Sequence, residues 1–429
     1  MPPADSVRIR PARNILGSLR VPGDKSISHR YAMLAALAAG RSRLENYSPG
    51  ADCNRSLECL RALGCDITRD EKSTVVIEGL GPQLHPPATT LDCGNSGSTM
   101  RMLSGIVAAQ PFTSELVGDE SLSRRPMKRV MDPLRRMGAE ITAPDDHAPL
   151  RITGTRLKGI NYVVPVASAQ VKTCLLLAGL LADGRTTIEE PTRTRDHGEL
   201  ALRAFGAEVT RSRNSATVAG GQRLHPLEAF IPGDSSSAAF FLCAAAIFPH
   251  SNLVIDGVLL NPTRSALLDV LAAMGSGINM MRVEEHHGEL VGTITLVPGS
   301  SKAIEISGAQ TALLIDELPV LAAIAPYTAG IIVRDAVELR VKESDRLSAV
   351  THNLQAMGAQ VEQTSDGWLI PGGQELHGAE IESFGDHRIA MAFSIAALRA
   401  EGETVIRSAE CVAISYPDFF ADLERLLDR

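Results

Sequence analysis

A short phrase recurs along the whole chain at nearly constant spacing. The motif consists of the end of an amphipathic segment, a Gly, a small residue and, shortly after, a β-branched residue. Its copies are LRALGCDIT at Gly64, LRRMGAEIT at Gly138, LRAFGAEVT at Gly206, LAAMGSGIN at Gly275 and LQAMGAQVE at Gly358. Successive glycines are 74, 68, 69 and 83 residues apart. A helix that ends at a C-terminal Gly and is followed by a strand explains this pattern. The C-terminal FFADLERLLDR resembles a sixth such helix with no strand after it.

A second series of segments alternates with the first. Each begins with a polar cluster and continues as an Ala- and Leu-rich stretch, and the starts are Ser26, Asn95, Ser168, Asp234, Asp316 and Asp386. Ser, Asn and Asp are good N-caps, and helices that are apolar on all sides are normally buried. The starts lie 66 to 82 residues apart. Together, the two series predict six βαβα-type units.

The two halves of the chain also resemble each other. Pro22–Ser26 (PGDKS) returns 210 residues later as Pro232–Ser236 (PGDSS). One or two copies of a helix-and-glycine phrase could arise by chance in any α/β protein, but five or six at regular spacing favour true repetition. Three units in each half predict two lobes of similar size.

The composition excludes several classes of protein. Lys and Arg number 42 and Asp and Glu 50, a formal charge of −8, and without a dense basic tract this argues against nucleic-acid binding. No apolar run reaches the ~18 residues of a membrane span, and the start lacks the apolar core of a signal peptide, so a cytoplasmic protein is expected. The seven Cys form no CxxC pair, which predicts buried, reduced thiols and not zinc ligands.

Basic residues gather at the expected helix starts of this acidic chain. Helix N-termini favour anions because they present unpaired N–H groups and a partial positive charge. The basic residues at these starts and in nearby polar segments are Lys25, Arg30, Arg101, Arg124, Arg125, Lys172, Arg195, Lys342, Arg346 and Arg388. Any one of them could be an ordinary surface charge. As a group they favour small, multiply anionic ligands.

Carboxylates in two segments could serve as acid or base. Asp316 and Glu317 open an apolar segment, where an acid can equally be a helix cap, and Glu343 stands between Lys342 and Arg346, with which it could simply form ion pairs. The chain has no GxxxxGK[ST], GxGxxG, HExxH or GxSxG motif and no cluster of metal ligands. These residues predict an anion-binding, two-lobed α/β protein without a cofactor, and they leave its reaction open.

Ten motifs in order along the chain resemble the 5-enolpyruvylshikimate-3-phosphate (EPSP) synthase family of enolpyruvyl transferases. They are GDKSISHR (23–30), GNSGSTMR (94–101), SLSRRPM (121–127), ASAQVK (167–172), TRDH (194–197), PGDSSSA (232–238), IDELP (315–319), RVKESDR (340–346), DHRIAM (386–391) and SYPDFF (415–420). The resemblance implies transfer of the enolpyruvyl group of phosphoenolpyruvate to the 5-hydroxyl of shikimate 3-phosphate, with release of phosphate. This is a step of the shikimate pathway to chorismate and the aromatic amino acids.

The resemblance also implies a fold. It is a two-lobed inside-out α/β barrel of six βαβαββ repeats, three in each lobe, with buried helices whose starts face the cleft between the lobes. The first lobe would comprise residues 1–21 and 232–429, and the second lobe residues 22–231.

Binding roles follow from the resemblance, motif by motif. The residues expected to bind shikimate 3-phosphate are Lys25, Ser26, Arg30, Ser168, Ala169, Gln170, Thr194, Arg195, Asp316 and Lys342. Those expected to bind phosphoenolpyruvate are Lys25, Gly97, Arg125, Gln170, Arg346 and Arg388. The arginines would hold carboxylate and phosphate through forked hydrogen bonds. Gly97 lacks a side chain, so the ligand could approach the helix start closely.

Proton transfer is assigned by the resemblance to three residues. Asp316 would be the base that takes the proton of the 5-hydroxyl. Glu343, assisted by Lys25, would protonate the methylene group of phosphoenolpyruvate. No cofactor or metal is implied. The expected partners are the two small anionic substrates, with no nucleic acid and no membrane, and the chain is expected to act as a monomer.

Three positions depart from the common family pattern. Ala169 replaces the second Ser of a Ser-Ser-Gln motif, Ile414 stands where a Lys is often found, and Glu338 stands where an Asn often precedes the RVKE motif. These changes resemble a divergent bacterial branch that includes glyphosate-tolerant enzymes. The Ala associated with tolerance in that branch corresponds here to Gly97, which leaves room for the inhibitor, so inhibition by glyphosate is expected.

Two alternative functions are weighed against this one. The sister transferase that acts on UDP-N-acetylglucosamine generally carries a reactive Cys on a mobile loop, and residues 121–127 contain none. A non-catalytic anion-binding protein could use the same fold. It would not need the acids and cations of the 316 and 342–346 segments together with Arg388.

Overall fold

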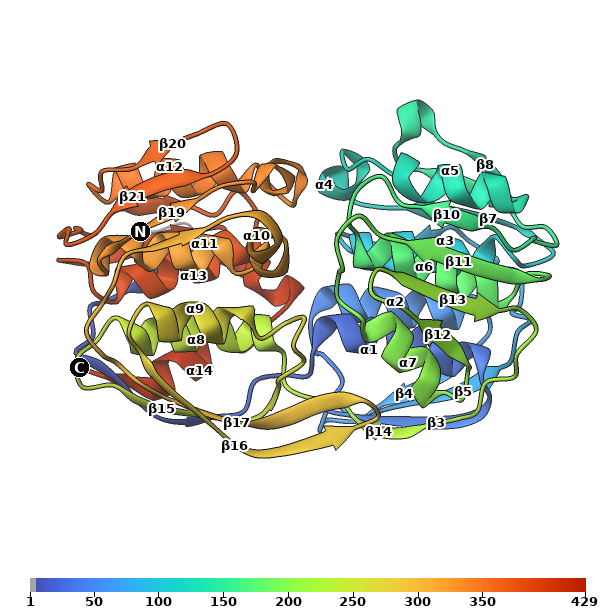
Figure 1. Cartoon of the computed structure of the whole chain (residues 1–429), viewed down its shortest axis with the longest axis horizontal. Coiled ribbons are helices and arrows are strands. Elements are labelled where there is room, and N and C mark those ends of the chain that lie inside the picture. The colour runs from blue at the N-terminus through green and yellow to red at the C-terminus, as the bar shows by residue number, and fades with distance from the viewer. Residues whose placement is uncertain (1–4) are drawn as a thin grey trace. The chain divides into compact units, whose positions relative to one another are not determined.

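The computed structural model describes residues 5–429, which form two compact units (Figure 1). The first unit comprises the described residues up to Pro22 with Pro232–Glu285 and Leu290–Arg429, and the second comprises Gly23–Ile231 with His286–Glu289. Two details differ from the expected lobes. Pro22 belongs to the first unit, and the turn His286–Glu289 belongs to the second, because its residues contact that unit: Glu289 pairs with His197 at 2.7 Å.

The second unit contains three open four-stranded sheets among its described residues, in the orders β14-β3-β5-β4, β6-β7-β9-β8 and β10-β11-β13-β12. In each sheet the first two strands are parallel and the others antiparallel. The strands are β3 (Ala39–Glu45), β4 (Asp66–Arg69), β5 (Val75–Leu80), β6 (Leu91–Asp92), β7 (Thr113–Val117), β8 (Glu140–Thr142), β9 (Leu150–Thr153), β10 (Asn161–Val163), β11 (Arg185–Glu189), β12 (Val209–Arg211), β13 (Ser215–Ala219) and β14 (Glu228–Phe230).

Three helices of the second unit are almost wholly buried, as their apolar sequences predict. They are α1 (Lys25–Leu37), α3 (Gly97–Val107) and α6 (Ala169–Leu180). Figure 1 shows α3 and α6 side by side, and α6 also contacts β11 and β13. The two helices approach so closely that a Cβ at Gly105 would lie 2.1 Å from the Cys174 carbonyl oxygen, so only Gly fits there.

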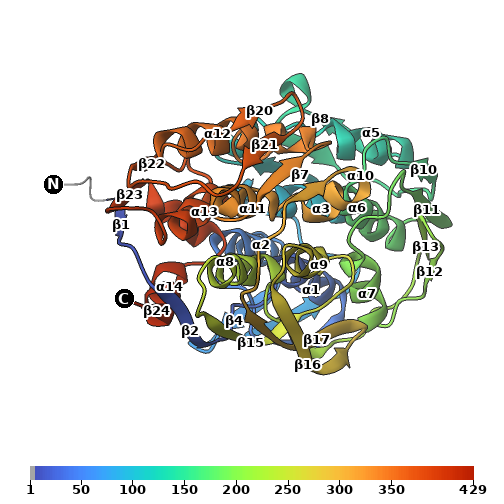
Figure 2. The same ribbon diagram turned by 60° about the vertical axis from the view of Figure 1, so that its left-hand side comes forward.

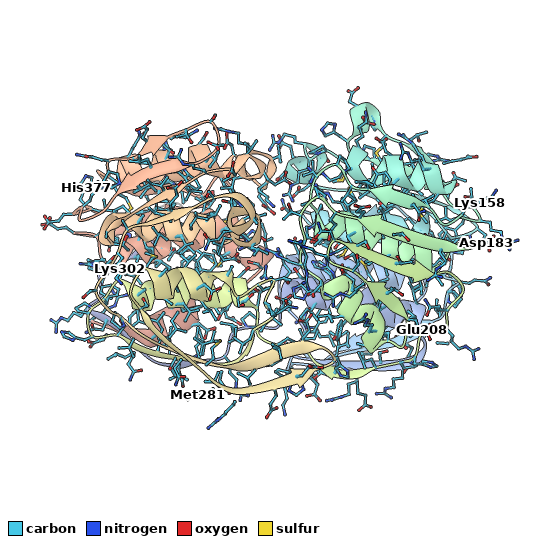
Figure 3. All side chains as sticks on the ribbon, in the orientation of Figure 1. Lys158, Asp183, Glu208, Met281, Lys302 and His377 are labelled. Atoms are coloured by element: carbon cyan, nitrogen blue, oxygen red, sulfur yellow. The ribbon has the colours of Figure 1, made fainter. Side chains whose placement is uncertain are left out.

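The remaining helices of the second unit differ in burial: His197–Ala204 buries six of its eight residues, and the others lie nearer the surface. They are α2 (Ala51–Ala62), α4 (Glu120–Ser123), α5 (Lys128–Met137), the 3₁₀ helix η1 (Pro144–Asp146) and α7 (His197–Ala204). Exposed side chains such as Lys158, Asp183 and Glu208 come from the strands and loops outside the buried helices (Figure 3).

The first unit repeats this arrangement with variations. Its sheet β18-β19-β21-β20 has the same parallel and antiparallel pairings, while β16-β17-β15-β2-β24 has five strands and β1-β23-β22 has three. The strands are β1 (Val7–Ile9), β2 (Asn14–Leu19), β15 (Asn252–Leu259), β16 (Gly277–His286), β17 (Glu289–Val297), β18 (Ile304–Ile306), β19 (Gly330–Val333), β20 (Glu362–Gln363), β21 (Trp368–Pro371), β22 (Glu380–Glu382), β23 (Thr404–Arg407) and β24 (Leu427–Asp428).

The core of the first unit is again built from three buried helices. They are α8 (Ser235–Ala246), α11 (Leu318–Ile324) and α13 (His387–Ala397), and they pack on one another (Figure 2). The other helices are α9 (Ala266–Ala273), α10 (Gly308–Leu314), α12 (Arg346–Ala356), α14 (Phe419–Leu426) and the 3₁₀ helices η2 (Ala325–Tyr327), η3 (Val337–Val341) and η4 (Ala409–Ile414).

The recurring glycines end helices as the sequence predicts. Gly64, Gly138, Gly206, Gly275 and Gly358 all have positive φ, between 85° and 111°. They follow α2, α5, α7, α9 and α12, and each is followed by a strand. This prediction is confirmed. The expectation for the C-terminus is wrong in one detail, because α14 is followed by the two-residue strand β24, which pairs with β2.

Two further features bear on the expectations from composition. All seven cysteines are buried and unpaired, as predicted. Among residues 5–429, no single helix is long and apolar enough to cross a membrane, although α10 and Leu318–Tyr327 pass that test as a pair bent by 98°.

Candidate active site

The start of α1 carries two of the expected ligand-binding cations of the second unit. Asp24 caps this helix by accepting the Ile27 N–H at 2.8 Å. Lys25 Nζ donates to Asp52 Oδ2 at 2.9 Å, and both side chains are largely buried. This pairing holds the ammonium group in place.

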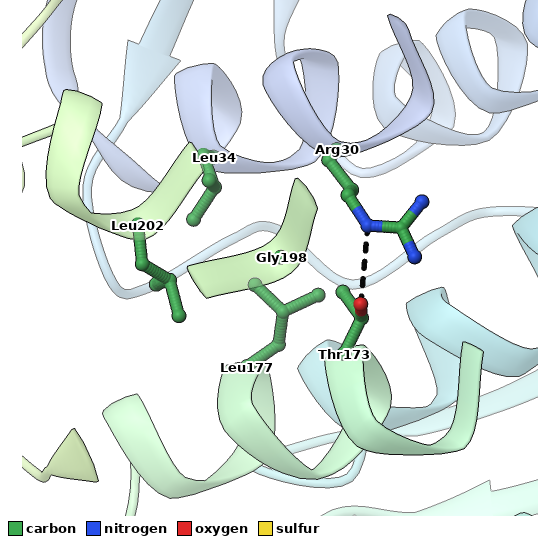
Figure 4. A pocket seen from close by; sticks show the side chains of 6 residues that line it. All are labelled: Arg30, Leu34, Thr173, Leu177, Gly198 and Leu202. Atoms are coloured by element: carbon green, nitrogen blue, oxygen red, sulfur yellow. Dashed lines mark hydrogen bonds between the residues drawn. The ribbon is translucent and has the colours of Figure 1, made fainter. Parts of the chain in front are cut away.

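Arg30, one turn further along α1, links α1 to α6 (Figure 4). Its Nε donates to Thr173 Oγ1 at 3.1 Å, its Nη1 to the Ser26 carbonyl at 2.8 Å and its Nη2 to the Ala169 carbonyl at 3.3 Å. Burial lowers the pKa of Arg30 to about 10, which still leaves it cationic at neutral pH. The structure therefore brings together the expected residues of the GDKSISHR and ASAQVK motifs.

The starts of α3 and α6 are joined through Gln170. Its Oε1 accepts from Arg101 Nη1 at 2.7 Å, and its Nε2 donates to Ser98 Oγ at 2.9 Å. Ser168 caps α6 by accepting the Val171 N–H at 3.4 Å. Because both ends of the Gln170 amide have partners, its position is set by α3 as well as by its own helix.

Gly97 lies where two guanidinium groups leave little space. A Cβ built there would be 3.0 Å from Arg101 Nη1 and 3.4 Å from Arg125 Nη1. Arg125 is buried, and its Nη2 donates to Asn95 Oδ1 at 2.8 Å and to Ser121 Oγ at 3.1 Å. The absence of a side chain at Gly97 thus keeps this helix start open beside two cations.

Thr194 belongs to a buried ionic network that the sequence reasoning missed. Its Oγ1 donates to Glu190 Oε1, and Lys172 Nζ lies 2.8 Å from Glu190 Oε2 and 3.0 Å from Glu199 Oε1. The side chains of Lys172, Glu190 and Glu199 are 2%, 3% and 5% exposed. Arg195 follows Thr194 and is half-buried. Lys172 is therefore a structural cation, and the apolar sequence after it was the only signal that it would be buried.

Asp316 lies among three cations of the first unit. Its Oδ1 is 3.6 Å from Arg346 Nη1 and 4.0 Å from Lys342 Nζ, and its Oδ2 is 3.9 Å from Arg388 Nη2. Arg388 Nη1 also donates to the Asp316 carbonyl at 2.8 Å. Such neighbours favour the ionised carboxylate. Asp316 is not the cap of α11, because Glu317 stands at that position, and four of the expected site residues meet here with Glu343.

Arg346 is fixed by two further carboxylates. Its Nε donates to Asp386 Oδ2 at 2.8 Å and its Nη2 to Glu343 Oε2 at 2.6 Å, and its side chain is 1% exposed. Burial opposes its charge, but Asp386, Glu343 and Asp316 together raise the pKa of Arg346 above its ordinary value. Burial lowers the pKa of Lys342, with Asp316 opposing that shift. The sequence predicted Asp386 only as a helix cap, which it also is, accepting the Arg388 N–H at 2.9 Å.

The chain matches a family model described as EPSP synthase (3-phosphoshikimate 1-carboxyvinyltransferase) over residues 9–423. A protein of that name from Koribacter versatilis is 62% identical over 425 residues, which cover 99% of this chain and all of the relative. The chain belongs to the EPSP synthase family. A second 3-phosphoshikimate 1-carboxyvinyltransferase, from Solibacter usitatus, is 53% identical over 98% of this chain and 99% of the relative.

Solved structures agree with this membership of the EPSP synthase family. The EPSP synthase of Acinetobacter baumannii has a TM-score of 0.88 and 40% sequence identity, covering 98% of each chain. The enolpyruvyl transferase NikO of Streptomyces tendae has a TM-score of 0.79 at 20% identity, over 99% of this chain and 98% of that one, and shows the shared fold alone. The family predicted from the ten motifs is confirmed, as is its class, a transferase of mixed α/β fold.

Proposed function

We infer that the chain catalyses the reaction for which its family is named. It transfers the enolpyruvyl group of phosphoenolpyruvate to the 5-hydroxyl of shikimate 3-phosphate and releases phosphate, as the family and its named relatives support. The observation that carries the proposal is the Asp316 carboxylate held within 4.0 Å of Arg346, Lys342 and Arg388. That arrangement offers a base beside cations suited to an anionic substrate.

The fold we propose is the inside-out α/β barrel of six βαβαββ repeats, three in each lobe. Four sheets with one shared strand pattern, and buried helices at three places in each unit, support it. The two sheets that differ from this pattern fit as the repeats to which the N-terminal segment supplies a strand, β2 in one and β1 in the other.

Phosphoenolpyruvate is proposed to bind to cations of both units, three at helix starts and one just after α4. In the second unit these are Lys25 and Arg125, next to Gly97 and Gln170, and in the first unit they are Arg346 and Arg388. Guanidinium groups already held by Asn95 and Asp386 are preorganised, so binding requires little ordering of side chains. Their forked donors match carboxylate and phosphate oxygens.

Shikimate 3-phosphate is proposed to bind mainly to the starts of α1 and α6. Ser26, Ser168, Ala169 and Gln170 present hydroxyl and backbone groups there, and Arg30, Thr194 and Arg195 adjoin them, with Lys25, Lys342 and Asp316 completing the set. Unpaired N–H groups at a helix start suit a phosphate. The ammonium group of Lys342 would lie beside the 5-hydroxyl that reacts.

Three proton transfers make up the proposed mechanism. Glu343 gives a proton to the methylene carbon of phosphoenolpyruvate, and Lys25 assists. Asp316 takes the proton of the 5-hydroxyl as the hydroxyl oxygen bonds to the phosphate-bearing carbon of phosphoenolpyruvate. Loss of a proton from the new methyl group then expels phosphate and restores the double bond. Glu343 is ion-paired with Arg346 in this structure, and an anionic ligand that competes for Arg346 would favour the proton uptake that Glu343 needs.

Phosphate release from the two substrates tests the function directly. The wild-type chain should release phosphate only when both substrates are present, and no release would refute the proposal. Asp316→Asn should lower kcat by about 100-fold or more, because a positioned base typically contributes 10² to 10⁴. Asp269→Asn is the matched control, since Asp269 is an exposed aspartate of α9 in the same unit.

The working state of the chain is also a proposal. We expect a cytoplasmic monomer that needs neither cofactor nor metal. Light scattering during gel filtration, at the concentration used for the assay, would show a mass near 45.7 kDa. A stable mass of twice that value would exclude the monomer.

A further inference from the structure

The repeated PGDSSSA motif begins a chain of buried polar contacts that ends at the proposed site. Arg264 Nη2 donates to Ser236 Oγ at 2.6 Å, and Arg264 Nε donates to Ser235 Oγ at 3.1 Å. Ser236 Oγ in turn donates to Glu317 Oε1. The side chains of Arg264 and Glu317 are 3% and 5% exposed, so both charges depend on protein partners.

The number of protons that each group can donate fixes the direction of these hydrogen bonds. A serine hydroxyl has one proton to donate. Because Ser236 Oγ accepts from the Arg264 guanidinium, which can only donate, its own proton is left for Glu317. The Arg264 guanidinium also pairs with Asp234, with Nη2 3.5 Å from Oδ1. The backbone turn before Arg264 is fixed by Asn261 Oδ1, which accepts from the Thr263 N–H at 2.8 Å and from the Thr263 hydroxyl at 2.7 Å.

Glu317 connects Ser236 to Arg388 of the proposed site. Its Oε1, the atom that accepts from Ser236, lies 3.8 Å from Arg388 Nη1. The same Nη1 donates to the Asp316 carbonyl at 2.8 Å. Glu317 therefore competes with any ligand for the charge of Arg388, and a carboxylate already bonded to Ser236 competes less strongly.

We propose that Ser236 and Arg264 are positioning residues for phosphoenolpyruvate binding, acting through Glu317 on Arg388. The proposal rests on the proposed function of Arg388. Without the Ser236 hydroxyl, the buried Glu317 carboxylate loses a donor and draws Arg388 toward itself and away from the substrate. The proton-transfer groups Asp316 and Glu343 keep their contacts with Arg346, so the loss appears mainly in substrate binding and less in turnover.

The experiment measures KM for each substrate and kcat for Ser236→Ala. We expect KM for phosphoenolpyruvate to rise about tenfold, the scale of one hydrogen bond to a charged group, while KM for shikimate 3-phosphate and kcat change less than about threefold. Ser237→Ala is the matched control. Ser237 is the next residue of α8 and is equally buried, and its hydroxyl takes no part in the contacts that join Arg264, Ser236 and Glu317.

A double-mutant cycle separates this role from a merely structural one. If Ser236 acts through Glu317, Ser236→Ala should change KM for phosphoenolpyruvate less than about threefold in a Glu317→Gln background. Ser236→Thr, which keeps the hydroxyl, should restore the wild-type KM to within threefold. A tenfold effect that persists in the Glu317→Gln background, an equal rise in both KM values, or an unchanged KM would overturn the proposal.

Folding is checked by the fluorescence of Trp368, which is buried in the same unit. If Ser236→Ala does not fold, Arg264→Gln replaces it with the same expected KM change and the same dependence on Glu317. Failure of the function itself is distinguishable, because wild-type protein would then release no phosphate. Active wild-type protein with unaltered variants would overturn only the positioning role.

Discussion

Replacing Lys172 by Met tests whether the buried network beneath the proposed shikimate 3-phosphate site holds the second unit together. Lys172 Nζ lies 2.8 Å from Glu190 and 3.0 Å from Glu199, and all three side chains are almost inaccessible to water. Met has nearly the same volume, so the change removes a charge without opening a cavity. Two buried carboxylates are left without their shared cation.

The expected loss in the free energy of unfolding depends on how the two carboxylates respond to the missing cation. Each attraction to Lys172 is worth about 6 kcal/mol before desolvation at an effective dielectric constant of 20. An unpaired carboxylate can instead take up a proton, which at pH 7 costs about 3.7 kcal/mol for an ordinary glutamic acid. We therefore expect the free energy of unfolding to fall by about 3 to 5 kcal/mol, the usual cost of breaking a buried ion pair.

Chemical denaturation followed by far-UV circular dichroism is the appropriate assay, since the single tryptophan, Trp368, lies in the first unit. Lys158→Met makes the same substitution at an exposed lysine of the second unit and should change stability by less than about 0.5 kcal/mol. A loss below about 1 kcal/mol at pH 7, or one equal to that of Lys158→Met, would refute the reasoning.

Three further predictions concern the site and its surroundings. Gly97→Ala should raise KM for phosphoenolpyruvate several-fold with a smaller change in kcat, since its Cβ would press within 3.0 Å of Arg101 Nη1; steady-state kinetics at saturating shikimate 3-phosphate measures this, and an unchanged KM would contradict it. Glyphosate should inhibit the wild-type chain at limiting phosphoenolpyruvate, and full turnover at high inhibitor would show that expectation to be wrong. Burial, reinforced by Lys25 and Arg30, lowers the pKa of His29 well below 6.5. Below about pH 6.5 the unfolded chain therefore binds a proton at His29 that the folded chain does not bind. The free energy of unfolding should fall as the pH is lowered in this range, by at most about 1.4 kcal/mol per pH unit from this residue. His29→Gln should flatten that slope in urea titrations at pH 5 to 7, and an identical slope would contradict the assignment.

Much of the fold could be read from short-range patterns. A polar cap before an apolar segment predicts where a helix starts, and a Gly after it predicts where the helix ends, because both signals act within a few residues. Ser168, Asp234 and Asp386 cap helices as predicted, and Gly138 ends α5 with φ of 111°. Two predicted caps are wrong by one or two residues, because Asp24 and Ser96 cap α1 and α3 in place of Ser26 and Asn95. The family motifs likewise lie within single segments, so Asp316, Arg346 and Arg388 could be proposed as site residues before any contact was known.

Local sequence patterns were enough to predict the buried helices, the glycines that end helices and the family of this chain. They did not predict which charged side chains face one another. Lys172 and Arg388 both stand near helix starts in the sequence, yet Lys172 is enclosed by Glu190 and Glu199 while Arg388 lies beside Asp316. The physical reason is that an ion pair depends on the directions of side chains from elements far apart in the chain, as in the bonds of Arg346 to Asp386 and of Ser236 to Glu317. Local sequence patterns carry no record of those directions.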